Sequence, residues 1–101
     1  MISVVVNSMN EGKKLEKCLA SVKGWADEIV VVDMESSDNT QEVAATAKAK
    51  VFTHKKVDYI EPVRKFAVAQ AKERWVLLLD PDEVVPKSLQ MELKRIAGEN
   101  L

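Results

Sequence analysis

Three carboxylates gather around a proline in Asp80-Pro81-Asp82-Glu83, directly after an apolar run. Side chains two apart in an extended chain point the same way, so Asp80 and Asp82 can present their oxygens to one side. Pro81 favours this geometry, since a residue before proline is pushed toward extended backbone. Such a pair suits Mg²⁺ or Mn²⁺, which is held by one or two carboxylates with substrate phosphates and water. The alternative is a polar turn that only caps the following helix.

The apolar run Trp75 to Leu79 predicts the strand that positions these carboxylates. A continuous apolar run between two helical patterns is typical of a parallel strand that is buried on both faces. Similar runs predict three further strands, at residues 2–6, 28–32 and 50–54, the last short enough for a sheet edge. We therefore expect an α/β, Rossmann-like, doubly wound and mostly parallel four-stranded sheet in the order 3-2-1-4, with helices on both faces.

Polar segments follow three of the four predicted strands. They are Asn7 to Glu11, Asp33 to Asp38 and Asp80 to Glu83. In open parallel sheets, ligands bind outside the carboxyl ends of the strands, where the strand order reverses. The three segments should therefore meet on one rim, which favours a binding role for Asp80 and Asp82 over simple capping.

Two of these segments also carry local signals for helix starts. Ser8 with Glu11, and Asp38 with Gln41, have the spacing of a capping box, in which two side chains satisfy the first backbone N–H groups of a helix. We expect each pair to begin the helix that follows it.

Arg64 and Lys65 fall in the first turn of the helix that Pro62 should open. Cations are unusual there, because a helix N-terminus carries partial positive charge. Their position suggests a nearby anion such as a diphosphate. A solvated pair of surface charges is the alternative.

Length and composition indicate one domain over residues 1–101, with 47% hydrophobic and 31% charged residues. A net charge of -1 gives no support to nucleic-acid or anionic-membrane binding. The single cysteine, Cys18, lies on the apolar stripe of a predicted helix and should be a core residue. No apolar run is long enough to span a membrane, so we expect a cytoplasmic protein, with the inner membrane face as an alternative location.

Several phosphate-binding schemes are excluded by missing motifs. The first strand is followed by neither G-x-G-x-x-G nor a P-loop, nor by the acidic pair of a phosphorelay receiver. The Gly-rich loop of sugar-activating nucleotidyltransferases is also missing. What remains is carboxylates for ribose, base and metal, with basic side chains for diphosphate, which is the chemistry of binding a nucleotide-sugar donor.

At this point the sequence resembles family 2 glycosyltransferases of the GT-A fold. The similarity lies in successive motifs at residues 2–11, 25–33, 64–68 and 77–83. Within that family, the sequence is most similar to the bacterial group of lipopolysaccharide-core β-glucosyltransferases. The resemblance implies the N-terminal, donor-binding half of a GT-A fold, and a UDP-sugar as the donor.

The resemblance also assigns donor contacts by position. It implies that Asn10 and Glu11 lie near the base and ribose, that Asp33 reads a uracil-type base, and that Arg64 lies near the diphosphate. The chain departs from the family pattern at Met9, where an aromatic residue is usual.

The metal site follows from the same resemblance. Asp80-Pro81-Asp82 matches the D-x-D motif, which implies that Asp80 faces ribose and metal, that Asp82 is a metal ligand, and that Glu83 completes the acidic rim. Another departure stands nearby on the predicted rim, where Met34-Glu35 replaces the usual Ser-Gly or Asp-Gly.

In the resembling enzymes a divalent metal, Mg²⁺ or Mn²⁺, neutralises the leaving diphosphate, and a carboxylate base activates an acceptor hydroxyl for transfer with inversion. The base and the acceptor-binding elements come from a later half that this chain lacks, so the catalytic residue is unknown. An acceptor glycan or lipid-linked saccharide is implied. A truncated or non-catalytic nucleotide-binding module is the alternative function, and a scaffold without ligand is a third.

In the order 3-2-1-4, the strand Trp75 to Leu79 is an edge without charge or proline to prevent pairing. We therefore expect either a homo-oligomer through this edge or a missing C-terminal half that covers it.

Overall fold

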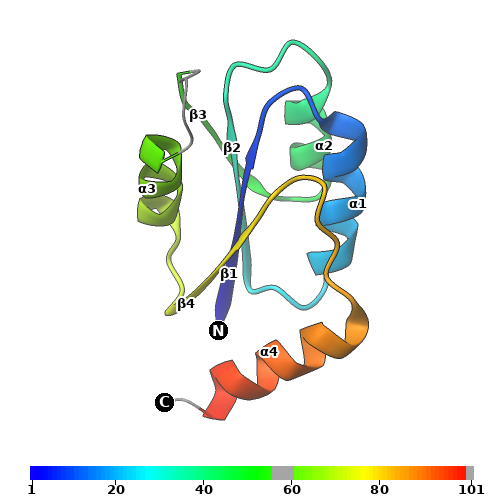
Figure 1. The fold of residues 1–101 in the computed structure, drawn as a ribbon, viewed down its shortest axis with the longest axis vertical. Helices are drawn as coiled ribbons and strands as arrows, with labels where there is room; N and C mark the ends of the chain where they lie inside the picture. The colour runs from blue at the N-terminus through cyan, green and yellow to red at the C-terminus, as the bar shows by residue number, and fades with distance from the viewer. Residues whose placement is uncertain (56–60, 100–101) are drawn as a thin grey trace.

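Strands and helices alternate along the whole chain (Figure 1). The computed structural model describes residues 1–55 and 61–99, and the side chains at positions 61, 62, 64 and 99 lie outside that description. The elements are β1 (Ile2–Ser8), α1 (Gly12–Val22), β2 (Glu28–Asp33), α2 (Thr40–Thr46), β3 (Lys50–Thr53), α3 (Glu61–Gln70), β4 (Trp75–Leu79) and α4 (Lys87–Glu99).

The four strands form one parallel sheet in the order β3-β2-β1-β4, which confirms the predicted fold class and strand order. β1 is central: Val4 pairs with Ile29 of β2 on one side and with Leu77 of β4 on the other. Its apolar residues, Ile2 and Val4 to Val6, fit this position, because a central parallel strand has helices on both faces.

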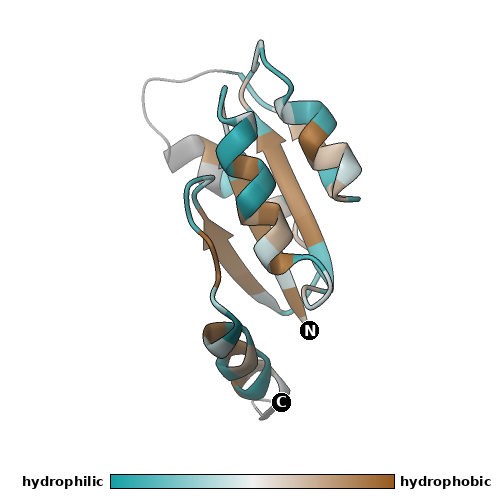
Figure 2. Cartoon of the chain, turned by 90° about the vertical axis from the view of Figure 1, so that its right-hand side faces the viewer, coloured by the Kyte–Doolittle hydropathy of each residue, from teal (hydrophilic) through white to brown (hydrophobic). Residues whose placement is uncertain are grey.

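Two cores lie on the two faces of the sheet. Val4 and Val6 of β1 pack with Leu15 and Leu19 of α1, whereas Val5 points to the other face and α3. Figure 1 shows α1 and α2 on one side of the sheet and α3 on the opposite side. Figure 2 shows the strands as mostly hydrophobic and the helices as a mixture of hydrophobic and hydrophilic residues, as packing of the helices on the sheet requires.

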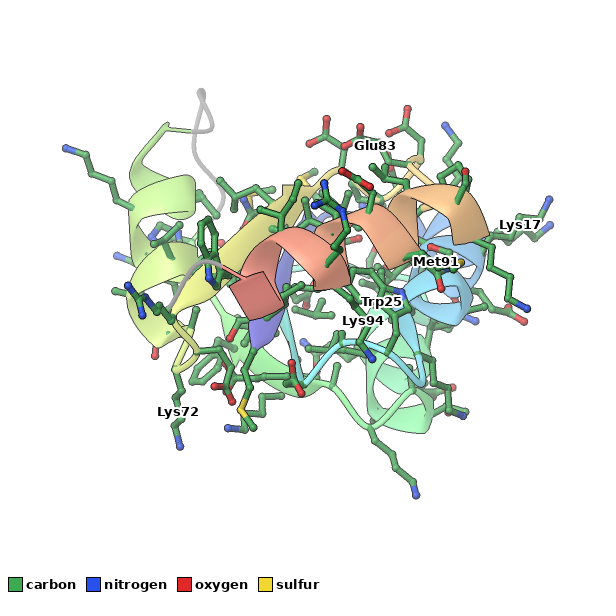
Figure 3. The ribbon with its side chains drawn as sticks, turned by 90° about the horizontal axis from the view of Figure 1, so that it is seen from below. Lys17, Trp25, Lys72, Glu83, Met91 and Lys94 are labelled. Atoms are coloured by element: carbon green, nitrogen blue, oxygen red, sulfur yellow. The ribbon has the colours of Figure 1, made fainter. Side chains whose placement is uncertain are left out.

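β4 is not buried on both faces, which corrects the prediction made from its apolar run. Trp75, Leu77 and Leu79 pack on the core that contains α1, but Val76 and Leu78 are 37% and 45% exposed. The physical reason is that the helices cover only part of the sheet. α3 packs on β1 and β2 and leaves this face of β4 open, while α4, which crosses the foreground of Figure 3 with Met91 and Lys94, packs on the other face.

Both predicted capping boxes are wrong. Ser8 stays in β1, where it pairs with Asp33, so its side chain cannot cap α1. The Gly12 N–H of α1 instead donates to Asp38 Oδ2 at 3.0 Å, from the loop after β2. The side chain of Gln41 turns to Asp33, 2.6 Å away, and forms no cap on α2. Contacts between strands or loops replaced the predicted bonds of Ser8 and Gln41. Asp38 keeps a local bond, because its Oδ1 accepts from the N–H of Thr40, the first residue of α2, at 3.0 Å.

Candidate functional site

The loop after β4 presents its carboxylates outward from a tight turn. The Asp80 N–H donates to Glu83 Oε1 at 2.7 Å, and the Glu83 N–H donates to the Asp80 carbonyl oxygen at 2.9 Å. Pro81 is buried, whereas Asp80, Asp82 and Glu83 are exposed; Figure 3 labels Glu83. The proline therefore anchors the loop, while the carboxylates of Asp80 and Asp82 stay exposed to a ligand.

Cys18 of α1 lies directly beneath this loop. Its Sγ is 3.7 Å from the carbonyl oxygen of Asp80, and its side chain is fully buried, as predicted for a core residue. Burial raises the pKa of the thiol to about 11, with further contributions from the negative charges of Glu83, Asp82 and Asp80. Burial and the nearby negative charges therefore favour the neutral form of the thiol at pH 7.

A pocket of about 300 Å³ opens at the carboxyl ends of the strands. It contains residues from all three polar segments, and its lining is Asn7, Met9, Glu11, Met34, Asp80, Pro81 and Asp82. The fold thus brings three predicted site residues, Glu11, Asp80 and Asp82, to one cavity. This is the meeting of strand ends that the parallel topology requires.

Asn10 lies beside the pocket and joins two loops. It is exposed and has a φ of 53°, in the left-handed region that asparagine tolerates better than most residues. Its N–H donates to Ser36 Oγ at 2.8 Å, and its Oδ1 accepts from the Ser37 N–H at 2.7 Å. Asn10 therefore fixes the loop after β1 against the loop after β2.

Asp33 is fully buried at the end of β2, with an exposed fraction of 0%. Its Oδ1 accepts from the Ser36 N–H at 3.2 Å, and its Oδ2 accepts from Gln41 Nε2 at 2.6 Å. In this arrangement the carboxylate holds the loop and the start of α2 in place. Its predicted contact with a base stays a prediction.

The basic side chains on α3 add less to the site. The side chain of Arg64 lies outside the described residues, so its predicted place near a diphosphate stays a prediction. Lys65 is exposed on the same helix.

A divalent cation in the acidic loop would have few protein ligands. Among residues 1–55 and 61–99, no group of three or more His, Cys, Asp or Glu side chains is placed to hold a metal. Asp80 and Asp82, however, line the same pocket. Two carboxylates are enough for Mg²⁺ or Mn²⁺ when phosphate oxygens and water complete the shell. The donor set therefore fits a metal that arrives with a phosphorylated ligand.

Sequence reasoning missed one polar group of the pocket, the side chain of Asn7. Its Oδ1 is buried and has no hydrogen-bond partner in the part of the chain that the structure describes. The available signal was an amide directly after the three consecutive valines Val4, Val5 and Val6.

Comparisons with known proteins agree with this fold. Residues 3–100 match the sequence profile of Glycosyl transferase family 2. An uncharacterized glycosyltransferase of Rickettsia bellii is 38% identical over 100 residues, which cover 98% of this chain and 34% of that protein.

Two solved structures have a similar fold. The crystal structure of S. aureus TarS 1-349 in complex with UDP is 26% identical, with a TM-score of 0.84, over 97% of this chain and 32% of that one. Glucosyl-3-phosphoglycerate synthase from Mycobacterium tuberculosis, in complex with Mn²⁺, UDP and glucosyl-3-phosphoglycerate, is 25% identical, with a TM-score of 0.69, over 97% of this chain and 38% of that one.

An all-parallel sheet with an acidic rim, a matching sequence profile and these structural likenesses define a class of protein. The chain belongs to glycosyltransferase family 2 and has the GT-A type of fold. It spans about a third of the length of the relatives it matches. No helix in the described ranges is long and apolar enough to cross a membrane.

Proposed function

We propose that the chain is a single nucleotide-sugar-binding domain, residues 1–101, of a glycosyltransferase. The carrying observation is the pocket at the strand ends, where Glu11, Asp80 and Asp82 converge. Its volume of about 300 Å³ lies at the lower end of the range for small-molecule sites, about 300 to 1,000 Å³. The donor is a UDP-sugar, in keeping with the UDP complexes of the two similar structures.

The residues have separate tasks in this proposal. Asp80 and Asp82 hold Mg²⁺ or Mn²⁺, and Asp80 also contacts ribose. Glu11 and Asn10 lie at the ribose and base, Asp33 supports the base side of the site, and Arg64 meets the diphosphate. When bound, the metal supplies positive charge that stabilises the departing diphosphate.

The transfer itself would go to a hydroxyl of a glycan or lipid-linked acceptor, with inversion at the anomeric carbon. The protein would then act in the cytoplasm or at the inner face of the membrane. A non-catalytic nucleotide-binding module is the alternative. A transfer assay separates the two, because the module would bind the donor without forming a glycoside.

We further propose that the free edge of β4 pairs with a second copy of the chain. The Trp75 N–H donates to the Met1 carbonyl oxygen, so Trp75 faces β1. The backbone groups of its neighbour Val76, and those of Leu78, consequently face away from the sheet. An apolar edge of this kind favours strand addition.

The donor site is tested by thermal unfolding with a panel of nucleoside diphosphates, with and without Mn²⁺. A ligand at about 100 times its Kd adds about 2.7 kcal/mol of stability, which raises Tm by roughly 10 °C or more for a domain of this size. We expect this shift with UDP and Mn²⁺, and we expect Asp82→Asn to abolish it.

Glu16→Gln is the matched control, because it removes one negative charge from an exposed position on α1 outside the pocket. It should keep the full shift. An equal shift in Asp82→Asn and the unchanged chain would contradict the proposed metal site.

A further inference from the structure

The acidic loop between β4 and α4, residues 80–85, is attached to α1 at both of its ends. At its start, Cys18 Sγ lies 3.7 Å from the carbonyl oxygen of Asp80. At its end, the Val85 N–H donates to Ser21 Oγ at 3.0 Å. Cys18 and Ser21 are three residues apart and are therefore neighbours on the surface of α1. In Figure 1 this segment accordingly runs alongside α1 on its way to α4.

Ser21 supplies the bond that holds the end of this loop. Val85 is buried, with 3% of its surface exposed, so its N–H needs a partner within the protein. The Ser21 hydroxyl accepts from that N–H and donates its own proton to the Cys18 carbonyl oxygen at 2.6 Å. Because it accepts one bond and donates another, the hydroxyl has a fixed orientation.

Gln90, near the start of α4, holds Val85 from the other side. Its Nε2 donates to the Val85 carbonyl oxygen at 3.0 Å and to the Ser21 carbonyl oxygen at 2.7 Å. Both backbone groups of Val85 are thus bonded, its N–H to Ser21 and its carbonyl oxygen to Gln90. We call Ser21 and Gln90 the clamp.

The carboxylates of the loop have few contacts of their own. Asp82 is exposed and forms no hydrogen bond or ion pair within the described part of the chain. The turn that Asp80 and Glu83 close through their N–H groups holds the middle of the loop. The position of Asp82 therefore depends on this turn and on how the two ends of the loop are held.

We propose that the clamp positions the acidic loop for the proposed metal site. By fixing Val85, Ser21 and Gln90 fix the distance that the loop must span. This distance in turn sets the position of Asp82 relative to Asp80. Neither clamp residue lines the pocket, so both act through the loop and not on the ligand. This inference rests on the proposed donor site and adds the residues that hold its metal ligands in place.

The experiment measures how much Mn²⁺ the chain needs to bind UDP. Calorimetry gives UDP binding at a series of Mn²⁺ concentrations for the unchanged chain, Ser21→Ala and Gln90→Met. Groups that orient metal ligands change metal affinity by about 10- to 100-fold. The clamp acts through the backbone of the loop, so we expect each variant to need about ten times more Mn²⁺ for half-maximal UDP binding. Saturating Mn²⁺ should restore the affinity of the unchanged chain.

Two control variants remove the same kinds of bond elsewhere. Thr46→Ala removes a hydroxyl of α2 that donates to the Glu42 carbonyl oxygen at 2.9 Å. Gln70→Met removes an amide of α3 that donates to the Phe66 carbonyl oxygen at 3.3 Å. Neither residue lines the pocket at the strand ends, so both variants should need no more Mn²⁺ than the unchanged chain.

Unfolding of the ligand-free chains separates positioning from folding. Ser21→Ala leaves the buried Val85 N–H without its partner and should lower Tm by about 4 to 8 °C. Binding is therefore measured well below this Tm, where every variant is folded. Under that condition a loss of stability alone leaves the Mn²⁺ requirement unchanged.

The inference and the proposed function can fail separately. If Ser21→Ala and Gln90→Met need no more Mn²⁺ than the unchanged chain, the clamp is only structural and the inference is overturned, while the donor site stands. If Thr46→Ala and Gln70→Met raise the requirement equally, the effect does not arise from the clamp and the inference also fails. If UDP does not bind the unchanged chain at any Mn²⁺ concentration, the proposed function fails, and the inference fails with it.

Discussion

Glu28 is the buried carboxylate with the most complete set of partners, at the start of β2. Its oxygens accept from the Ser3 hydroxyl at 2.7 Å, from Lys50 Nζ at 2.7 Å and from the Lys72 N–H at 2.8 Å. Burial alone would raise the pKa of this carboxyl, but the bonds from Lys50, Lys72 and Ser3 prevail and lower it to about 2. Glu28 therefore joins three segments at the amino end of the sheet.

This pairing predicts how stability depends on pH. The pKa of Glu28 is about 2 in the folded chain and near 4.5 in the unfolded chain, so its contribution is complete above about pH 4.5 and is lost as pH falls toward 2. Glu28→Gln should lower the free energy of unfolding at pH 7 by about 1 to 3 kcal/mol. It should also flatten the decline below pH 4.5, as followed by urea unfolding.

Glu92→Gln is the control for this charge change, because Glu92 is exposed and pairs with Arg95 on the surface of α4. It should leave the pH profile nearly unchanged. Stability curves of Glu28→Gln and the unchanged chain that run parallel from pH 7 to pH 2 would refute the role of Glu28.

At the scale of single residues, the sequence predicted which residues lie at the rim better than it predicted which hydrogen bonds they form. Glu11, Asp80 and Asp82 meet because strand ends in a parallel sheet must meet, and this follows from the apolar runs alone. The two hydrogen bonds of Asp33 depend on how the loop after β2 folds back. The orphan oxygen of Asn7 depends on the absence of a neighbour, and no local pattern encodes that.

The contact between the start of α1 and the loop after β2 decides how two elements of the rim fit together. Gly12 is buried against this loop, and an added Cβ would overlap Asn39 Oδ1 and lie 3.3 Å from Asp38 Oδ2. Gly98, in α4, has open space around it instead, with no atom of the described chain within 4 Å of an added Cβ. The two glycines therefore form a matched pair.

We expect Gly12→Ala and Gly98→Ala to have opposite effects in denaturant unfolding. Gly12→Ala should destabilise the chain by about 1 to 3 kcal/mol, the usual cost of overpacking. Gly98→Ala should stabilise it by up to about 1 kcal/mol, because alanine favours a helix more than glycine does. If Gly12→Ala left the free energy of unfolding unchanged, the start of α1 and the loop after β2 would not be packed as described.

The elements themselves were predictable because each strand is a distinct apolar run. The exposed face of β4 was not, since its residues are as apolar as those of β1 and only the position of α3 distinguishes them. The predicted capping box at Ser8 is absent for a related reason. Ser8 pairs with β2 as part of β1, and its neighbours in sequence do not reveal this contact.

At the scale of the whole molecule, the proposed pairing of a second copy with the edge of β4 can be tested by self-association. If a second copy adds to this edge, sedimentation should show a dimer whose population rises with concentration. Leu78→Lys places a charge on the exposed face and should weaken the dimer about tenfold or more without lowering Tm.

Met91→Lys makes the same change at an exposed position of α4 and is the control. It should leave the association constant unchanged. Equal association of all three chains would place any dimer contact elsewhere.

The central strand of this sheet is synthesised well before one of its two neighbours. Ile2 pairs with Trp75, near the other end of the chain, so β1 stays open on one side until β4 has left the ribosome. Closing such a long loop costs entropy before the pairing repays it, and parallel sheets accordingly fold slowly. Until then Val4, Val5 and Val6 form an exposed hydrophobic segment, the kind of surface that chaperones bind and that aggregates when translation outpaces folding.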